Sequence, residues 1–145
     1  MTINYMEEAI KEAKKAYDSG EVPVGCVIVK SKQIIARAHN MTESTNDATC
    51  HAELLAIKSA LKAEKKKYLE ECEMYVTLEP CAMCAGAIIN TRIKRLYIGA
   101  QEPKTGCCGT VVNLFSEVSG NTEVYIGMSE DRCKHLLKDF FNNKR

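Results

Sequence analysis

Apolar residues near the start of the chain recur at steps of three and four positions from Ile3 to Tyr17, and Lys and Glu fill much of the remainder. This spacing places the apolar side chains on one side of a helix. Asp18-Ser19-Gly20 is typical of a helix end, because glycine adopts the left-handed conformation of a C-terminal cap. Pro23 then cannot continue a helix. The pattern therefore predicts a first, amphipathic helix that ends before Gly20.

Short apolar runs and helical patterns alternate along the rest of the chain. The run Val24–Val29 predicts a buried strand, and Lys30-Ser31-Lys32 turns into a second strand near 33–38, which forms an antiparallel hairpin with the first. The further predicted elements are helices at 51–64, 81–89 and 130–141 and strands at 74–78, 96–99 and 124–126. Polar loops occupy 40–49 and 101–113. This order predicts an α/β fold in which helices cover both faces of a sheet that begins with the hairpin.

Length and composition set the class of protein. The chain has 145 residues, 46% of them hydrophobic and 27% charged, which is typical of one soluble domain and predicts a single domain over 1–145. No apolar run is long enough to span a bilayer. The first residues lack the pattern of a signal peptide, so we expect a cytoplasmic protein.

The net charge of +1 gives no attraction of the whole molecule to a polyanion. Local charge is different, because basic residues gather in three places: Lys62, Lys65, Lys66 and Lys67; Arg92, Lys94 and Arg95; and Lys144 and Arg145. Each group is most simply a solvated helix or chain end. If several of them meet at the mouth of a pocket, they would form a phosphate-binding surface.

Eight cysteines are the anomaly of the composition. In a domain without a leader they indicate reduced thiols, some of which hold a metal. Cys81 and Cys84 follow Pro80 at the predicted start of a helix, where the helix dipole favours thiolates. His51 stands at the start of the preceding helix and can supply a third ligand if the two helices lie side by side. Three protein ligands would leave the fourth position of a zinc ion open to water.

Glu53 lies two residues after His51, about 200° around an ideal helix. A bend in the first turn would still let its carboxylate reach a zinc-bound water, take its proton and pass protons to a substrate. Alone, the Cys-x-x-Cys pair could equally be a redox pair or half of a structural zinc site. Together, His51-Ala52-Glu53 and Pro80-Cys81-Ala82-Met83-Cys84 form the known signature of zinc deaminases.

The other candidate ligands have weaker support. Cys50 adjoins His51 and is the main rival; as a fourth ligand it would make the zinc structural and the protein an interaction domain rather than an enzyme. Two histidines, His39 and His135, lack a partner pattern. The remaining cysteines are by default buried small hydrophobes or exposed thiols, namely Cys26, Cys72, Cys107, Cys108 and Cys133.

Over nearly its whole length the sequence resembles the bacterial tRNA-specific adenosine deaminases, within the cytidine deaminase superfamily. Four segments carry the resemblance: Val22-Pro23-Val24-Gly25, His51-Ala52-Glu53, the block 76–87 (VTLEPCAMCAGA) and Lys104-Thr105-Gly106. The zinc motif identifies only the superfamily, and the long block and the Lys-Thr-Gly loop narrow it. The resemblance implies a three-layer α/β/α fold with a five-stranded mixed sheet, one catalytic zinc per subunit and a homodimer.

The resemblance also implies a reaction and its residues. The reaction is hydrolysis of adenosine to inosine at the wobble position of a tRNA anticodon, typically of an arginine tRNA. His51, Cys81 and Cys84 would bind zinc, and Glu53 would shuttle protons while hydroxide attacks adenine C6. Asn40 would hold the base or ribose, Ala52 would offer a backbone group, and the loop with Glu102 and Lys104 would contact the anticodon.

The chain departs from the family pattern in that loop. Glu102 stands where Asp is common, and Cys107-Cys108 where small alanines are common. The departures thus fall in the loop that is expected to contact the anticodon, and not in the zinc motif. The main alternative function is deamination of a free base or nucleoside, such as guanine or cytosine, with the same zinc site.

Overall fold

The computed structural model describes residues 2–143, and there the order of strands and helices follows the sequence pattern. The strands are β1 (Gly25–Lys30), β2 (Gln33–His39), β3 (Cys72–Leu78), β4 (Arg95–Ala100) and β5 (Glu123–Ile126). The helices are α1 (Tyr5–Asp18), α2 (Ala52–Glu64), α3 (Ala82–Asn90), α4 (Leu114–Glu117) and α5 (Glu130–Asn143). Only α4 was not predicted, because a single turn is too short to show a helical period.

Helix α1 starts two residues later than the apolar pattern indicates. The side chain of Asn4 accepts a hydrogen bond from the amide of Glu7 and caps the helix, and Ile3 lies outside it and is exposed. At the other end Gly20 has a φ of +79°, the left-handed conformation predicted for the cap. The capping side chain therefore decides where this helix begins.

The predicted hairpin is present. β1 and β2 are antiparallel, and the two residues that join them, Ser31 and Lys32, have φ of 50° and 63°. Two left-handed residues in succession define the type I′ turn, whose twist matches that of the strands. A bulge beside Ile28 and Val29 shifts the register of the pair.

The sheet is mixed, in the order β2-β1-β3-β4-β5. β1 runs antiparallel to β2 and β3, while β3, β4 and β5 are parallel to one another. The parallel strands therefore end at one edge of the sheet, which we call the carboxyl edge, with Leu78 and Ala100. They begin at the opposite, amino edge, with Cys72 and Arg95. β1 starts at the carboxyl edge, where the amide of Gly25 donates to the Thr77 hydroxyl.

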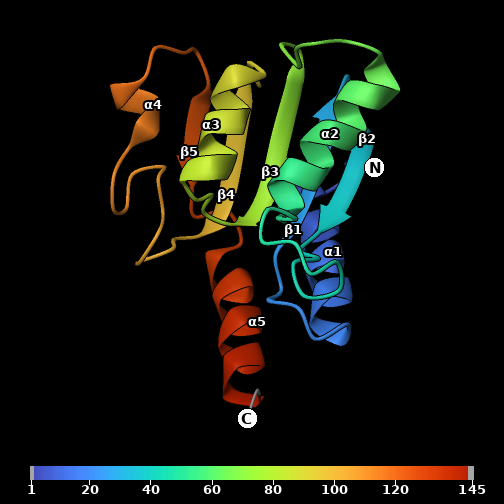
Figure 1. Cartoon of the computed structure of the whole chain (residues 1–145), viewed down its shortest axis with the longest axis vertical. Helices are drawn as coiled ribbons and strands as arrows, with labels where there is room; N and C mark the ends of the chain where they lie inside the picture. The colour runs from blue at the N-terminus through green and yellow to red at the C-terminus, as the bar shows by residue number, and fades with distance from the viewer. Residues whose placement is uncertain (1, 144–145) are drawn as a thin grey trace.

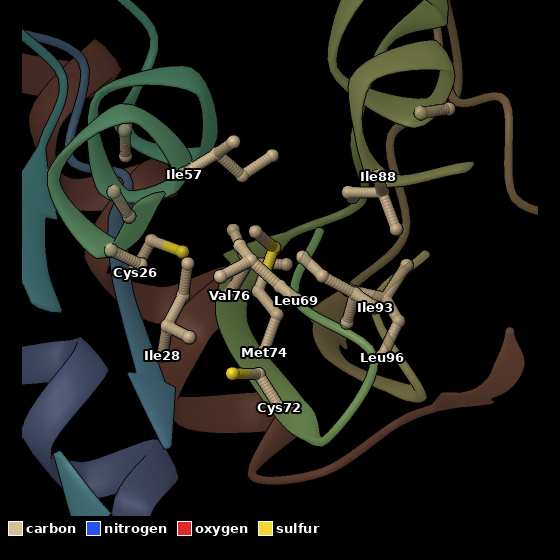
Figure 2. Packing of buried hydrophobic residues seen from close by; sticks show 14 of the residues in the cluster. Cys26, Ile28, Ile57, Leu69, Cys72, Met74, Val76, Ile88, Ile93 and Leu96 are labelled. Carbon is tan, nitrogen blue, oxygen red and sulfur yellow. The ribbon is translucent and has the colours of Figure 1, made fainter. Parts of the chain in front are cut away.

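Helices cover both faces of the sheet, as predicted. α2 and α3 lie side by side on one face, and α1 and α5 pack on the other (Figure 1). Strand side chains alternate between the two layers, so Cys26 and Ile28 face α2, whereas Val27 and Val29 face α1. Figure 2 shows the first layer, where Met74, Val76 and Leu96 of the central strands pack below Ile57 of α2 and Ile88 of α3.

Gly25 lets α1 lie directly on β1. A Cβ at this position would come within 2.0 Å of the Ala9 carbonyl oxygen and 2.4 Å of the Ala13 nitrogen. Only glycine fits such an approach of helix and strand, which accounts for the glycine of the Val-Pro-Val-Gly segment. The packing fixes the start of β1 at the carboxyl edge.

Among residues 2–143 no helix combines the length and the apolar character that a bilayer span requires.

Candidate active site

The metal-ligand candidates lie where two helices begin. His51 is the N-cap of α2, with the extended dihedrals φ −75° and ψ 150°, and Cys81 is the N-cap of α3. Cys84 follows as the third residue of α3. Both helices start at the carboxyl edge. His51 therefore lies next to Cys81 and Cys84, which follow it by 30 and 33 positions in the sequence. Because His51 stands outside the helix, the 200° separation expected for Glu53 does not apply.

The geometry of these three residues fits a tetrahedral zinc ion. The Nδ1 atom of His51 lies 3.6 Å from the sulfur of Cys81 and 3.7 Å from that of Cys84, and the three ligand atoms lie within 4.8 Å of one another. Zn–S bonds of about 2.3 Å and Zn–N bonds of about 2.0–2.1 Å at tetrahedral angles place sulfur and nitrogen about 3.6 Å apart. His51 would thus bind through Nδ1.

In the part of the chain that the structure describes, the site has three candidate protein ligands. Cys50 is not one of them, so the closed four-ligand site that we considered lacks its fourth member. His39 instead faces the carboxylate of Glu12 at 3.4 Å, and His135 lies in a groove between α1 and α5. An open fourth position is the arrangement that catalytic zinc sites keep for water.

The two thiols are electrostatically unequal. Hydrogen bonds from Cys84 and His51 lower the pKa of Cys81 to about 3, whereas the Cys81 sulfur and burial raise the pKa of Cys84. The Cys81 thiolate in turn raises the pKa of His51. Cys81 is thus the more acidic of the two thiols, and a metal ion bound by both sulfurs would displace the proton of Cys84.

Glu53 is buried next to these ligands, with 4% of its surface exposed. Burial disfavours its charged form and raises its pKa to about 7. A carboxyl group with a pKa near neutrality can both take up and release a proton, as the predicted proton shuttle requires.

A pocket of about 250 Å³ opens in front of this group, which is room for one nucleobase. Three of the four predicted substrate contacts line it: Asn40, Ala52 and Glu102. The fourth, Lys104, does not; its side chain is exposed and its amide donates to the carboxylate of Glu102. The neighbouring Thr105 lines the pocket instead. The lining is completed by Val22, Val24, Thr42, His51, Glu53, Leu78, Glu79 and Cys81.

Asn40 has capacity left for a ligand. Its side-chain oxygen accepts from the amide of Thr42, and its nitrogen donates to the carbonyl oxygen of Val22, both at 3.3 Å. An amide has two N–H groups and two acceptor lone pairs, so one of each stays available. Asn40 can therefore form both a donor and an acceptor bond with a base or sugar.

Known proteins match this chain over nearly all of its length. The family model of the cytidine and deoxycytidylate deaminase zinc-binding region matches residues 2–100. Over 143 residues the chain is 49% identical to the tRNA-specific adenosine deaminase of Bacillus subtilis (strain 168), and the match covers 97% of this chain and 89% of that protein. The chain belongs to the tRNA-specific adenosine deaminases. It is therefore an enzyme of the zinc-binding deaminase family.

Further matches agree with this membership. The tRNA-specific adenosine deaminase of Aquifex aeolicus (strain VF5) is 44% identical, with 97% of this chain and 94% of that protein covered. A structure from a study of A-to-I editing by tRNA:A34 deaminases superposes with a TM-score of 0.89 at 43% identity, covering 92% of this chain and 98% of the other. The guanine deaminase of Nitrosomonas europaea shares the fold, with a TM-score of 0.83 at 20% identity and coverage of 93% and 81%.

Two of the basic groups do not reach the deaminase pocket. Lys62 and Lys65–Lys67 lie at the far end of α2, about 20 Å along its 13 residues from His51. Arg92 and Arg95 lie at the amino edge, where they pair with Glu70, Glu73 and Glu123. These two groups therefore do not meet the condition for a phosphate-binding surface at the pocket mouth, because the helix and strand directions carry them to the other edge. Lys144 and Arg145 lie outside the described residues.

The sequence reasoning assigned no role to two glutamates beside the pocket. Glu21 and Glu79 are buried, with 0% and 2% of their surface exposed, and both bind backbone amides of the loops around the pocket. A glutamate between an apolar strand and Pro80 is the only local signal of the second. For the cysteines that could be either buried hydrophobes or exposed thiols, the structure shows burial in every case: Cys26, Cys72, Cys107, Cys108 and Cys133.

Proposed function

We propose that this enzyme hydrolyses adenosine to inosine at the wobble position of a tRNA anticodon, with an arginine tRNA as its substrate. The observation that carries the proposal is the three-ligand group of His51, Cys81 and Cys84 with buried Glu53 at the floor of a pocket of nucleobase size. The identity of 49% to a tRNA-specific adenosine deaminase supports the choice of base and of RNA.

A zinc ion held by His51, Cys81 and Cys84 supplies Lewis acidity that brings the pKa of a water molecule close to 7. Glu53 holds the proton that this water loses, since its own pKa lies near 7. The same carboxyl group delivers this proton to ring N1 of adenine while the oxygen of the deprotonated water bonds C6. It then takes the proton of the new C6 hydroxyl group and passes it to the amino group, which leaves as ammonia and leaves a carbonyl at C6. Burial keeps bulk water from competing for these protons.

The pocket walls orient the base. Asn40 offers its free N–H and lone pair to the base or ribose, and the backbone of Ala52 faces the same space. Glu102 lines the mouth, where we propose that the loop with Lys104 meets the neighbouring anticodon nucleotides. A pocket for one base requires that the target be turned out of its stack, which costs little in a single-stranded loop.

A panel of substrates tests the proposal. An anticodon stem-loop of an arginine tRNA with A at the wobble position should be converted to inosine, whereas the same stem-loop with that A moved by one position should not. Free adenosine, guanine and cytosine should react at least 100-fold more slowly, because they lack the flanking nucleotides. Faster deamination of free guanine or cytosine than of the stem-loop would favour the alternative, a base or nucleoside deaminase.

We further propose that the enzyme acts as a homodimer in the cytoplasm, where tRNA is modified. Exposed apolar side chains at Met83 on α3 and at Val111 and Val112 in the loop after β4 support a subunit contact near the pocket. Light scattering of the purified protein should give twice the 16.1 kDa mass of one chain. A single-chain mass at micromolar concentration would contradict the dimer.

A further inference from the structure

The two loops that form the walls of the pocket are mostly polar. One wall contains Asn40 and Thr42, and the other contains Glu102 and Thr105. In the second loop Cys107 and Cys108 pack into the core, but the polar residues on either side of them do not. The backbone amides of such polar stretches need hydrogen-bond acceptors, and buried acceptors would fix the position of each wall.

The carboxylate of Glu79 accepts hydrogen bonds from the second wall. Its Oε1 atom accepts from the amide of Glu102 at 3.0 Å and from the Thr110 hydroxyl, and its Oε2 atom accepts from the amides of Cys108 at 2.9 Å and Thr110 at 3.2 Å. An ionised carboxylate has about four acceptor sites, so all of them are used. One buried side chain thus fixes three backbone positions across residues 102–110.

The same wall is tied to the segment that carries a metal ligand. The amide of Glu79 donates to the carbonyl oxygen of Ala100, and the amide of Cys107 donates to that of Pro80. Cys81 follows immediately. The wall at 102–110 and the metal ligand Cys81 therefore share one anchor at the end of β3.

The carboxylate of Glu21 accepts hydrogen bonds from the opposite wall in the same way. Its Oε1 atom accepts from the amide of Glu43 at 2.9 Å, and its Oε2 atom accepts from the amide of Ser44 at 2.6 Å and from the Ser44 hydroxyl. This side chain is fully buried. The loop after Asn40 is therefore held by a second carboxylate, which lies in the segment between α1 and β1.

We propose that Glu21 and Glu79 are the positioning residues of the pocket, each holding one wall at the distance that the substrate requires. The inference rests on the proposed function in one respect, namely that the nucleotide to be deaminated binds between the two walls. It assigns the spacing of the walls to two carboxylates whose hydrogen bonds go to the loops at 43–44 and 102–110.

A substitution at Gly106 can test the position of the second wall independently of Glu79. A Cβ there would lie 2.5 Å and 2.6 Å from carboxyl atoms of Glu79 and 2.6 Å from the carbonyl oxygen of Glu102. Gly106 does not have a positive φ, so alanine is compatible with its backbone and acts by steric contact alone. Gly106→Ala should therefore push the loop away from Glu79 and reproduce the loss of its hydrogen bonds.

Amide hydrogen exchange of the zinc-loaded enzyme tests the proposal without reference to activity. Glu79→Gln replaces two acceptor sites by donors, so exchange at Glu102, Cys108 and Thr110 should speed up at least tenfold while Glu43 and Ser44 keep their rates. Glu21→Gln should do the reverse. Glu12→Gln, a buried glutamate that binds Lys15 and His39 instead of loop amides, should change neither loop.

Two outcomes would overturn the proposal. Amide exchange in the glutamine variants could become faster throughout the chain, or it could stay unchanged in both loops. If Glu79→Gln does not fold, Gly106→Ala and Thr110→Val provide the same test with the carboxylate in place. Steady-state kinetics on the stem-loop adds a second readout: misplaced walls should raise KM at least fivefold, whereas mere loss of folded enzyme lowers kcat at constant KM. A wild-type enzyme inactive on the stem-loop would refute the proposed function and leave the exchange test intact.

Discussion

The two edges of the sheet use charged residues in opposite ways. At the carboxyl edge Glu21, Glu53 and Glu79 are at most 4% exposed, and two of them bind backbone amides. At the amino edge Arg95 pairs with Glu73 and Glu123, and the side chains of all three are between 26% and 54% exposed. Both regions are rich in charge, but only the first removes it from water.

This difference decides what each edge can do. A buried carboxylate without its partners costs the full desolvation of the group, so its hydrogen bonds are specific and its loss is expensive. An exposed ion pair is screened by solvent and salt and contributes little. We therefore expect chemistry and wall geometry to depend on the carboxyl edge, and the amino edge to tolerate change.

The largest expected effect is the loss of the metal. Cys84→Ser removes one of three ligands, so the zinc content should fall from about one ion per chain to well under half after dialysis against a chelator, and activity should disappear. Elemental analysis measures this. Cys72→Ser changes an equally buried thiol at the amino edge and should keep its zinc; loss of zinc there as well would mean that the metal site is not local.

Glu53→Gln should come next. It keeps the shape of the side chain but cannot carry the proton, so turnover of the stem-loop should fall by about 10²–10⁴ while zinc content is unchanged. The matched control is Glu70→Gln at the amino edge, which removes only an exposed pairing with Arg92. Activity of Glu53→Gln within tenfold of the wild type would remove the proton shuttle from the mechanism.

A pH dependence separates the buried carboxylates from the exposed ones. Burial alone would raise the pKa of Glu21, but hydrogen bonds from Ser44 and Glu43 outweigh it and hold the pKa below 4.5. Its contribution to stability is thus present above about pH 4.5 and is lost as the pH falls through the folded pKa. Glu21→Gln should cost about 1–3 kcal/mol at pH 7 and less near pH 3.5, as measured by urea unfolding. A cost that does not change with pH would exclude the ionised form.

The smallest effect is expected at the amino edge. Arg95→Gln should change the free energy of unfolding by less than about 1 kcal/mol, because its ion pairs are partly exposed. Even this should shrink in 1 M salt. A larger loss that persists in high salt would show that the contrast between the two edges is overstated.

Local patterns predicted the elements correctly, and the three predicted metal ligands lie close together in the structure. Hydrophobic spacing located the strands and the four longer helices, because each buries a periodic face against the sheet. The ligands were accessible for the same reason: Cys81 and Cys84 lie one helical turn apart, and His51 marks the start of the neighbouring helix. Short-range spacing is enough to predict groups that a single turn brings together.

The walls of the pocket depended on contacts that no local pattern contains. Glu79 binds amides 23 to 31 residues away, and Glu21 binds amides 22 and 23 residues away. Whether the basic clusters would meet at the pocket was open for the same reason, and the clusters after α2 and α3 lie at the edge opposite to the helix starts.

The sequence by itself therefore determined the fold class and predicted which residues would bind zinc and carry the proton, because hydrophobic spacing and the two deaminase motifs are local features of the chain. Only the tertiary structure decided which loops line the pocket, that Thr105 rather than Lys104 faces it, and which charges are taken out of water. Burial and the hydrogen-bond partners of a buried carboxylate are properties of the packed chain. They allow a glutamate to hold the loops of the pocket in place.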